Sequence, residues 1–124
     1  MGLGRLLIVD DDRSFAAELK ADGERLGLEV RTVHDTSAFE STLQSWEPTI
    51  IAMDLVMPDS DGLELIRICG GFSYRGVLIL MSGGFELYLK MAEEIARTNK
   101  LNVVAKLPKP LRPKQFSYLL SSLI

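Results

Sequence analysis

Apolar residues gather in five short runs that recur at even spacing along the chain. The runs occupy residues 5–9, 28–33, 49–53, 77–81 and 102–105. Four of them are apolar almost throughout, which is typical of strands buried on both faces of a sheet. The run at 28–33 mixes charged with apolar residues. It therefore predicts a strand at the edge of that sheet.

Segments with the helical period separate these runs. The residues that can open or close the first three helices are Asp12 and Gly27, then Asp35 or Thr36, then Ser60 or Asp61. A fourth helix is predicted from about Phe85 to Ala96, with a core stripe of Phe85, Tyr88, Ala92 and Ile95. Leu87, Leu89 and Met91 spread apolar surface around the rest of it. The last helix begins near Pro113, a favoured first-turn residue, and carries an apolar stripe.

Alternation of strands and helices gives five βα units in succession, and this order indicates a class of fold. Buried strands that alternate with helices predict a parallel sheet with helices on both faces. Right-handed crossovers place the carboxyl end of every strand at one edge of that sheet. Ligands of such open sheets bind at this edge, close to the point where the strand order reverses.

Composition limits the classes of function. The chain has 124 residues, which predicts one domain, with the 47% hydrophobic and 25% charged content of a soluble globular protein. A net charge of −3 argues against direct nucleic-acid binding. The single cysteine, Cys69, allows no internal disulfide and favours a cytoplasmic location. No apolar run approaches the roughly 20 residues that span a bilayer, so no membrane partner is expected.

Polar side chains follow the predicted strands where each one ends. The first strand leads into Asp10, Asp11 and Asp12; the third ends in Asp54, the fourth in Ser82, and the fifth is followed by Lys109 and Pro110. The second ends in His34, which we interpret as an ordinary surface-loop residue. Carboxylates, a hydroxyl and an ammonium group are therefore expected at one edge of the sheet.

These groups suit phosphoryl chemistry around a metal ion. Clustered carboxylates repel one another unless a cation joins them. Oxygen ligands with room for water suit Mg²⁺. A carboxylate beside Mg²⁺ can act as a nucleophile toward phosphorus and form an aspartyl phosphate, while the metal and a lysine neutralise charge on the transferring group. A serine hydroxyl could then hydrogen-bond one of its oxygens.

Four motifs together resemble the receiver domains of two-component response regulators, the CheY-like family. They are LLIVDDD at 6–12, MDLVMPDSDG at 53–62, LILMSG at 78–83 and KLPKPL at 106–111. The resemblance covers essentially the whole chain, residues 1–124. It implies a flavodoxin-like (βα)5 three-layer sandwich whose five-stranded parallel sheet has the order 2-1-3-4-5.

The resemblance also implies roles for particular residues. Asp54 would accept the phosphoryl group, Ser82 would be the switch hydroxyl, and Lys109 would contact the phosphoryl oxygens. The Mg²⁺ ligands would be Asp11 directly, Asp10 mainly through water, Asp54, and the backbone carbonyl of Val56. The protein would be a phosphorylated switch rather than an enzyme.

Implied partners are a sensor histidine kinase or phosphotransfer protein, and a homodimer or output partner at the fourth helix, fifth strand and fifth helix. One position departs from the family, which usually has an aromatic residue three positions before its lysine. Lys106 occupies that position here. The usual coupling between the switch serine and an aromatic ring is therefore not expected.

Two other functions and several plain structural roles stand beside this hypothesis. Lys106 favours a receiver-like scaffold that acts without phosphorylation. A haloacid-dehalogenase-type phosphatase would use Asp10 and Asp12, but it needs later metal-binding acids, and none follow Glu94. Asp12 is otherwise a helix cap, Ser82 the start of a turn, Cys69 a packed core residue and Trp46 a packing residue.

Overall fold

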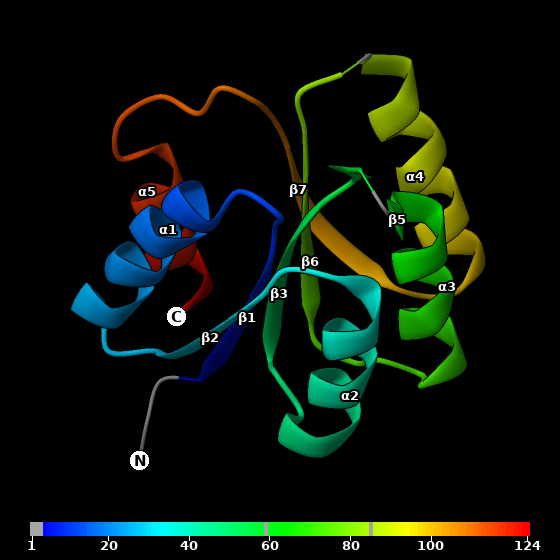
Figure 1. The fold of residues 1–124 in the computed structure, drawn as a ribbon, viewed down its shortest axis with the longest axis horizontal. Helices are drawn as coiled ribbons and strands as arrows, with labels where there is room; N and C mark the ends of the chain where they lie inside the picture. Colours follow the sequence, from blue (N-terminus) through cyan, green and yellow to red (C-terminus); the bar gives the residue numbers. More distant parts are fainter. Residues whose placement is uncertain (1–3, 59, 85) are drawn as a thin grey trace.

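The computed structural model describes residues 4–58, 60–84 and 86–124 of the chain (Figure 1). Its elements, in chain order, are β1 (Arg5–Val9), α1 (Arg13–Arg25), β2 (Glu29–Val33), α2 (Thr36–Trp46), β3 (Ile50–Asp54), β4 (Val56–Met57), β5 (Ser60–Asp61), α3 (Gly62–Gly71), β6 (Val77–Ser82), α4 (Glu86–Thr98), β7 (Asn102–Pro108) and α5 (Gln115–Leu123). The five predicted strands are therefore β1, β2, β3, β6 and β7.

The main sheet is parallel and has the order β2-β1-β3-β6-β7. This confirms the predicted order 2-1-3-4-5, with β2 at an edge. An additional hairpin of β4 and β5, each two residues long, follows β3. The register pairs Val9 with both Val33 and Met53, and Ser82 with Pro108. The carboxyl ends of the strands therefore meet at one edge, as the sequence predicts.

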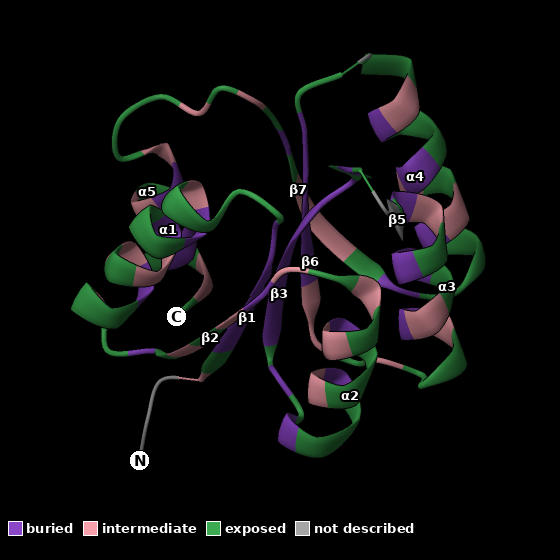
Figure 2. Ribbon diagram, viewed as in Figure 1, coloured by how far each residue is buried: buried purple, intermediate pink, exposed green. Residues whose placement is uncertain are grey.

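Helices cover both faces of the sheet. Figure 1 shows α1 and α5 on one face and α2, α3 and α4 on the other. The central strands β1, β3 and β6 are buried through most of their length, whereas the edge strands β2 and β7 are largely exposed or half-buried (Figure 2). Alternate residues of β1 enter different cores: Leu7 and Val9 pack beneath α2, α3 and α4, while Leu6 and Ile8 pack beneath α1 and α5. The fold is the predicted three-layer sandwich.

Side-chain caps fix the starts of three helices. Asp12, Asp35 and Asp61 each accept a hydrogen bond from a backbone N–H of the first turn of α1, α2 and α3. Each cap satisfies a donor that the helix itself leaves unpaired. Gly27 follows α1 with a φ of 90°, the left-handed conformation that favours glycine at a helix end.

The last helix begins at Gln115, later than the start predicted near Pro113. Lys114 has a φ of 64°, so its backbone cannot continue a right-handed helix back to Pro113. Gln115 instead turns its side-chain oxygen back to accept the N–H of Arg112. The apolar stripe is confirmed at Phe116 and Leu120, which are buried.

The fourth helix differs from its prediction at one apolar residue. Leu89 is 5% exposed and belongs to the core, so its assignment to the outer surface is wrong, whereas Leu87 and Met91 are exposed. Ala92 is buried as predicted, and Phe85 lies outside the described residues. Among the described helices, none combines the length and apolarity needed to cross a bilayer.

Candidate functional site

Three carboxylates meet at the carboxyl edge of the sheet. Asp10 and Asp11 follow β1, and Asp54 ends the neighbouring strand β3. One oxygen from each lies within 4.8 Å of the others. Asp10 and Asp54 are buried, at 0% and 4% exposure, whereas Asp11 is exposed. The site is therefore an acidic pocket with one side open to water.

Backbone donors orient the two buried carboxylates. Asp10 Oδ1 accepts the N–H of Asp12 at 2.9 Å, and Asp54 Oδ1 accepts the N–H of Val56 at 3.0 Å. Both bonds span two residues, as in Asx-turns. Since the side chain of Asp12 caps α1, the chain that leaves β1 is fixed on both sides of Asp11. The remaining oxygens of Asp10 and Asp54 are left to face Lys109.

Lys109 reaches this pocket from the connection after β7. Its Nζ lies 2.7 Å from Asp10 Oδ2 and 3.1 Å from Asp54 Oδ2. Its backbone N–H donates to the carbonyl of Ser82 at 2.8 Å, and the Lys109–Pro110 peptide is cis. The predicted convergence of Asp10, Asp54 and Lys109 is therefore present in the structure.

Burial and neighbouring charges set the electrostatics of the pocket. Burial and the nearby carboxylate of Asp10 raise the pKa of Asp54 above 3.8, although the Val56 N–H and Lys109 oppose this shift. For Lys109, burial lowers the pKa, but bonds to Asp10 and Asp54 outweigh burial and raise it overall. The lysine therefore stays charged at neutral pH and partly compensates the two acids.

Ser82 lies beside the acids but bonds within its own loop. It is 1% exposed at the end of β6, adjacent to β3 in the sheet. Its Oγ accepts the N–H of Gly84 at 3.1 Å. The serine is therefore placed at the predicted edge, and its hydroxyl proton remains available to donate to an oxygen.

Two further residues contact the site, and the sequence predicted no part in the site for either. His34 follows β2, and its Nδ1 lies 2.8 Å from the carbonyl oxygen of Asp10. The carbonyl can only accept, so Nδ1 carries a proton and donates. The Phe15 ring lies over the Lys109 ammonium, with 4.5 Å between Nζ and the ring centroid. His34 does lie in the loop after β2, as predicted, but it is half-buried and bonds the backbone of Asp10, a contact that the sequence did not predict.

Lys106 takes no part in the acidic pocket. Its Nζ bonds Oε1 of Glu93 on α4 at 3.0 Å, and Glu93 also pairs with Arg97. This ion pair joins β7 to α4 where the family usually has an aromatic ring. The position is polar and partly exposed. The structure therefore has an ion pair at the position where the sequence lacks the aromatic residue usual in the family.

The donor set fits Mg²⁺. All three side chains offer carboxylate oxygens, the donors that this ion prefers, and the exposure of Asp11 leaves room for the waters that Mg²⁺ retains. Among the described residues, Asp12 does not belong to this group of carboxylates. Its carboxylate instead caps α1. That placement removes one of the two acids on which the phosphatase hypothesis depends.

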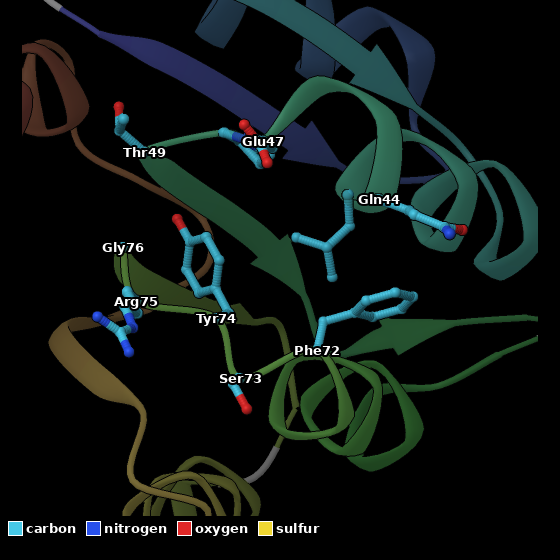
Figure 3. Close-up of a pocket in the computed structure, with 10 residues that line it drawn as sticks. Gln44, Glu47, Thr49, Phe72, Ser73, Tyr74, Arg75 and Gly76 are labelled. Atoms are coloured by element: carbon cyan, nitrogen blue, oxygen red, sulfur yellow. The ribbon is translucent and has the colours of Figure 1, made fainter.

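A separate cavity of about 580 Å³ lies at the other end of the strands. Figure 3 shows the rings of Phe72 and Tyr74 at this cavity, with Glu47 and Thr49 nearby. Thr49 precedes β3, whereas Asp54 ends it, so this cavity and the acids lie at opposite edges of the sheet. The acidic pocket does not open into it.

Comparison with known sequences finds matches across most of the chain. The family model described as "Response regulator receiver domain" matches residues 6–120. The DNA-binding transcriptional regulator NtrC of Azospirillum brasilense is 38% identical over 66 residues, which cover 53% of this chain and 14% of NtrC. Response regulator MprA of Mycobacterium avium is 35% identical over 63 residues, which cover 51% of this chain and 28% of MprA. The chain thus spans only a fraction of these relatives.

Solved structures match over nearly the full length. A response regulator from Colwellia psychrerythraea is 35% identical with a TM-score of 0.85, covering 98% of this chain and 96% of that one. The beryllofluoride-activated NtrC4 receiver domain dimer is 25% identical with a TM-score of 0.81, covering 95% and 93%. Sequence and fold therefore point to the same family.

Proposed function

Since the chain belongs to the family of response regulator receiver domains, we propose that it accepts a phosphoryl group on Asp54 from a histidine kinase or phosphotransfer protein. The observation that carries this proposal is Lys109, which holds Asp10 and Asp54 together beside Asp11. We treat residues 1–124 as one receiver domain that works in the cytoplasm, a compartment that suits the single free cysteine.

The chemistry assigned to Asp54 is nucleophilic. One of its carboxylate oxygens attacks the phosphorus of a donor phosphohistidine, so that a P–O bond forms while the P–N bond breaks. The donor imidazole leaves with the electron pair of that bond. Lys109 shifts from the Asp54 carboxylate toward the phosphoryl oxygens, and the Ser82 hydroxyl donates a hydrogen bond to one of them.

The metal site is assigned to Asp10, Asp11, Asp54 and the backbone carbonyl of Val56. Both oxygens of Asp10 are already engaged, one by the Asp12 N–H and one by Lys109. Both oxygens of Asp54 are engaged in the same way, by the Val56 N–H and Lys109. Asp11 is exposed, which supports direct contact for Asp11, while contact through water for Asp10 follows the family resemblance. When bound, Mg²⁺ supplies positive charge to the oxygens of the transferring group.

The output of the switch is assigned to α4, β7 and α5. Leu87 and Met91 of α4 and Tyr118 of α5 are exposed. The NtrC4 receiver domain forms a dimer in its beryllofluoride-activated state, which supports a homodimer or an output partner at this surface. The chain is then a substrate and a switch rather than an enzyme, and its charge of −3 disfavours direct nucleic-acid contact.

Phosphorylation by acetyl phosphate with Mg²⁺ tests this function. The wild-type protein should gain the mass of one phosphoryl group, and Asp54→Asn should gain none, because its amide is not a nucleophile toward phosphorus. Omission of Mg²⁺ should abolish the gain in wild type. A wild-type protein that stays unmodified at saturating reagent, or an equal gain in Asp54→Asn, would refute the assignment.

Lys106 supports a second candidate, a receiver-like scaffold that acts by binding alone. The ion pair of Lys106 with Glu93 occupies the place of the aromatic ring that normally relays the state of the serine. A scaffold should bind its partners equally well as wild type and as Asp54→Ala. A phosphorylation-dependent change in partner affinity, lost in Asp54→Ala, would decide for the switch.

A further inference from the structure

Phe15 is anchored in the first turn of α1, directly beside the acidic pocket. Its backbone N–H donates to the side chain of Asp12 at 3.0 Å, so the helix cap fixes its position. Its ring lies over the ammonium of Lys109, with the centroid 4.5 Å from Nζ. Phe15 and Lys109 also line one cavity of about 520 Å³ beside the site. The ring thus forms part of the wall of a cavity that Lys109 also lines.

The ammonium of Lys109 has contacts of two kinds. Two of its three N–H groups can donate to Asp10 and Asp54. Nζ lies 2.7 Å from Asp10 Oδ2 and 3.1 Å from Asp54 Oδ2. The ring of Phe15 covers a further part, and the Lys109 side chain keeps 20% exposure. The negative face of an aromatic ring attracts a cation, more strongly where water is displaced. Lys109 is therefore held by two acids and a ring.

We propose that Phe15 is a positioning residue for Lys109, one whose ring keeps the ammonium in the pocket while its anionic partners change. This inference rests on the proposed function, in which Lys109 moves from a carboxylate to a phosphoryl oxygen. A hydrogen bond to a fixed acceptor would resist that shift. Attraction to a ring face persists out to roughly 6 Å from the ring centroid, so the ammonium, now at 4.5 Å, can move toward a new anion and remain over Phe15.

Packing is the other role that Phe15 has. Its side chain is half-buried and packs against the core beneath α1 and α5. Packing alone predicts that Phe15→Leu loses some stability whatever residue stands at 109. A positioning role predicts that part of the loss depends on the lysine. A double-mutant cycle separates the two, because the packing loss is common to both backgrounds.

The cycle uses wild type, Phe15→Leu, Lys109→Met and the double variant, unfolded in urea without metal. We expect Phe15→Leu to lower the folding equilibrium constant about three- to tenfold more in the Lys109 background than in the Met background. The Cε methylene protons of Lys109 provide a second readout by NMR. Ring currents should shift them upfield in wild type and in Phe15→Tyr, and not in Phe15→Leu.

Beryllofluoride with Mg²⁺ is the functional probe. Its dissociation constant should rise about three- to tenfold in Phe15→Leu and stay within about twofold in Phe15→Tyr, which keeps the ring. Zero coupling in the cycle, with equal beryllofluoride affinity in wild type and Phe15→Leu, overturns the inference. Failure of wild type to bind beryllofluoride overturns the proposed function instead, since the unfolding cycle still measures the Phe15–Lys109 contact.

Discussion

Lys106 and Lys109 lie close together at the end of β7, and each holds a carboxylate at nearly the same distance. Lys106 Nζ is 3.0 Å from Glu93, and Lys109 Nζ is 3.1 Å from Asp54. The surroundings differ, because the exposed fractions of the side chains are 36% and 18% in the first pair and 20% and 5% in the second. Asp10 adds a second buried acid beside Lys109.

Each lysine lowers the pKa of its carboxylate, yet the net pKa shifts of the two carboxylates have opposite signs. The hydrogen bond from Lys106 lowers the pKa of Glu93 below its ordinary value, as expected for an acid beside a cation. The pKa of Asp54 is raised, because burial and the charge of Asp10 outweigh Lys109 and the Val56 N–H. Burial and like charge, rather than the distance between the paired atoms, therefore separate a surface ion pair from the proposed phosphoacceptor site.

The largest effect that separates the two lysines should be on reactivity. Lys109→Met removes the cation that would stabilise the charge of the transferring group, so the rate of Mg²⁺-dependent phosphorylation by acetyl phosphate should fall about 100-fold. Lys106→Met removes a cation from a pair outside the pocket and should change the rate by less than about twofold. Phosphorylated protein is quantified over time by intact mass.

Both variants must be shown to be folded like wild type before their phosphorylation rates are compared. Circular dichroism of both variants should overlay that of wild type at the reaction temperature. An equal loss of rate in Lys106→Met would break the comparison, because it would mean that the Glu93 pair supports the chemistry. An unchanged rate in Lys109→Met would remove Lys109 from its assigned role.

Much of the fold could be predicted because the central strands are apolar almost throughout. β1 occupies the predicted residues 5–9, and β3 is displaced from its prediction by one residue. β7 extends to Pro108, beyond the predicted 102–105, because pairing with β6 continues through Lys106, Leu107 and Pro108, where a lysine and a proline interrupt the apolar run. The β4–β5 hairpin is too short to have a period. The start of α5 depends on the backbone of Lys114, which composition does not reveal.

The sequence likewise predicted some residues of the site and not others. Asp10, Asp54 and Lys109 could be expected at one place, because parallel strands bring their carboxyl ends to one edge. The contact of His34 with the backbone carbonyl of Asp10 was not predicted. It depends on the register that pairs Val9 with Val33. The position of His34 after a predicted strand, at the same edge, was the available signal. The ring of Phe15 has the pattern of a core residue, and its approach to the lysine depends on side-chain orientation.

A smaller effect should appear in the pH dependence of stability. The raised pKa of Asp54 means that the folded state holds its proton more tightly than the unfolded state does. That contribution to stability is fully present below pH 3.8 and is lost as pH rises through the folded pKa. Asp54→Asn avoids the loss, so its free energy of unfolding in metal-free protein at neutral pH should exceed that of wild type. Urea unfolding across a pH series measures it.

Glu93→Gln is the matched control, since the sign is reversed at Glu93. Its pKa is lowered, so its contribution is present above pH 4.5 and is lost as pH falls through the folded pKa. Glu93→Gln should therefore be no more stable than wild type at neutral pH. A less stable Asp54→Asn, or the same pH profile for both variants, would show that the two carboxylates do not differ as described.

The smallest effect concerns the ion pair between Lys106 and Glu93. Because both side chains keep contact with water, Lys106→Met should lower the free energy of unfolding by no more than about 0.5 kcal/mol, and 1 M salt should largely remove the difference. Lys106→Met, Glu93→Gln and the double variant, unfolded in urea at low and high salt, form the cycle that measures the pair. Coupling above about 1 kcal/mol that persists in high salt would contradict a surface pair. The link between β7 and α4 would then be strong enough to resist movement of α4.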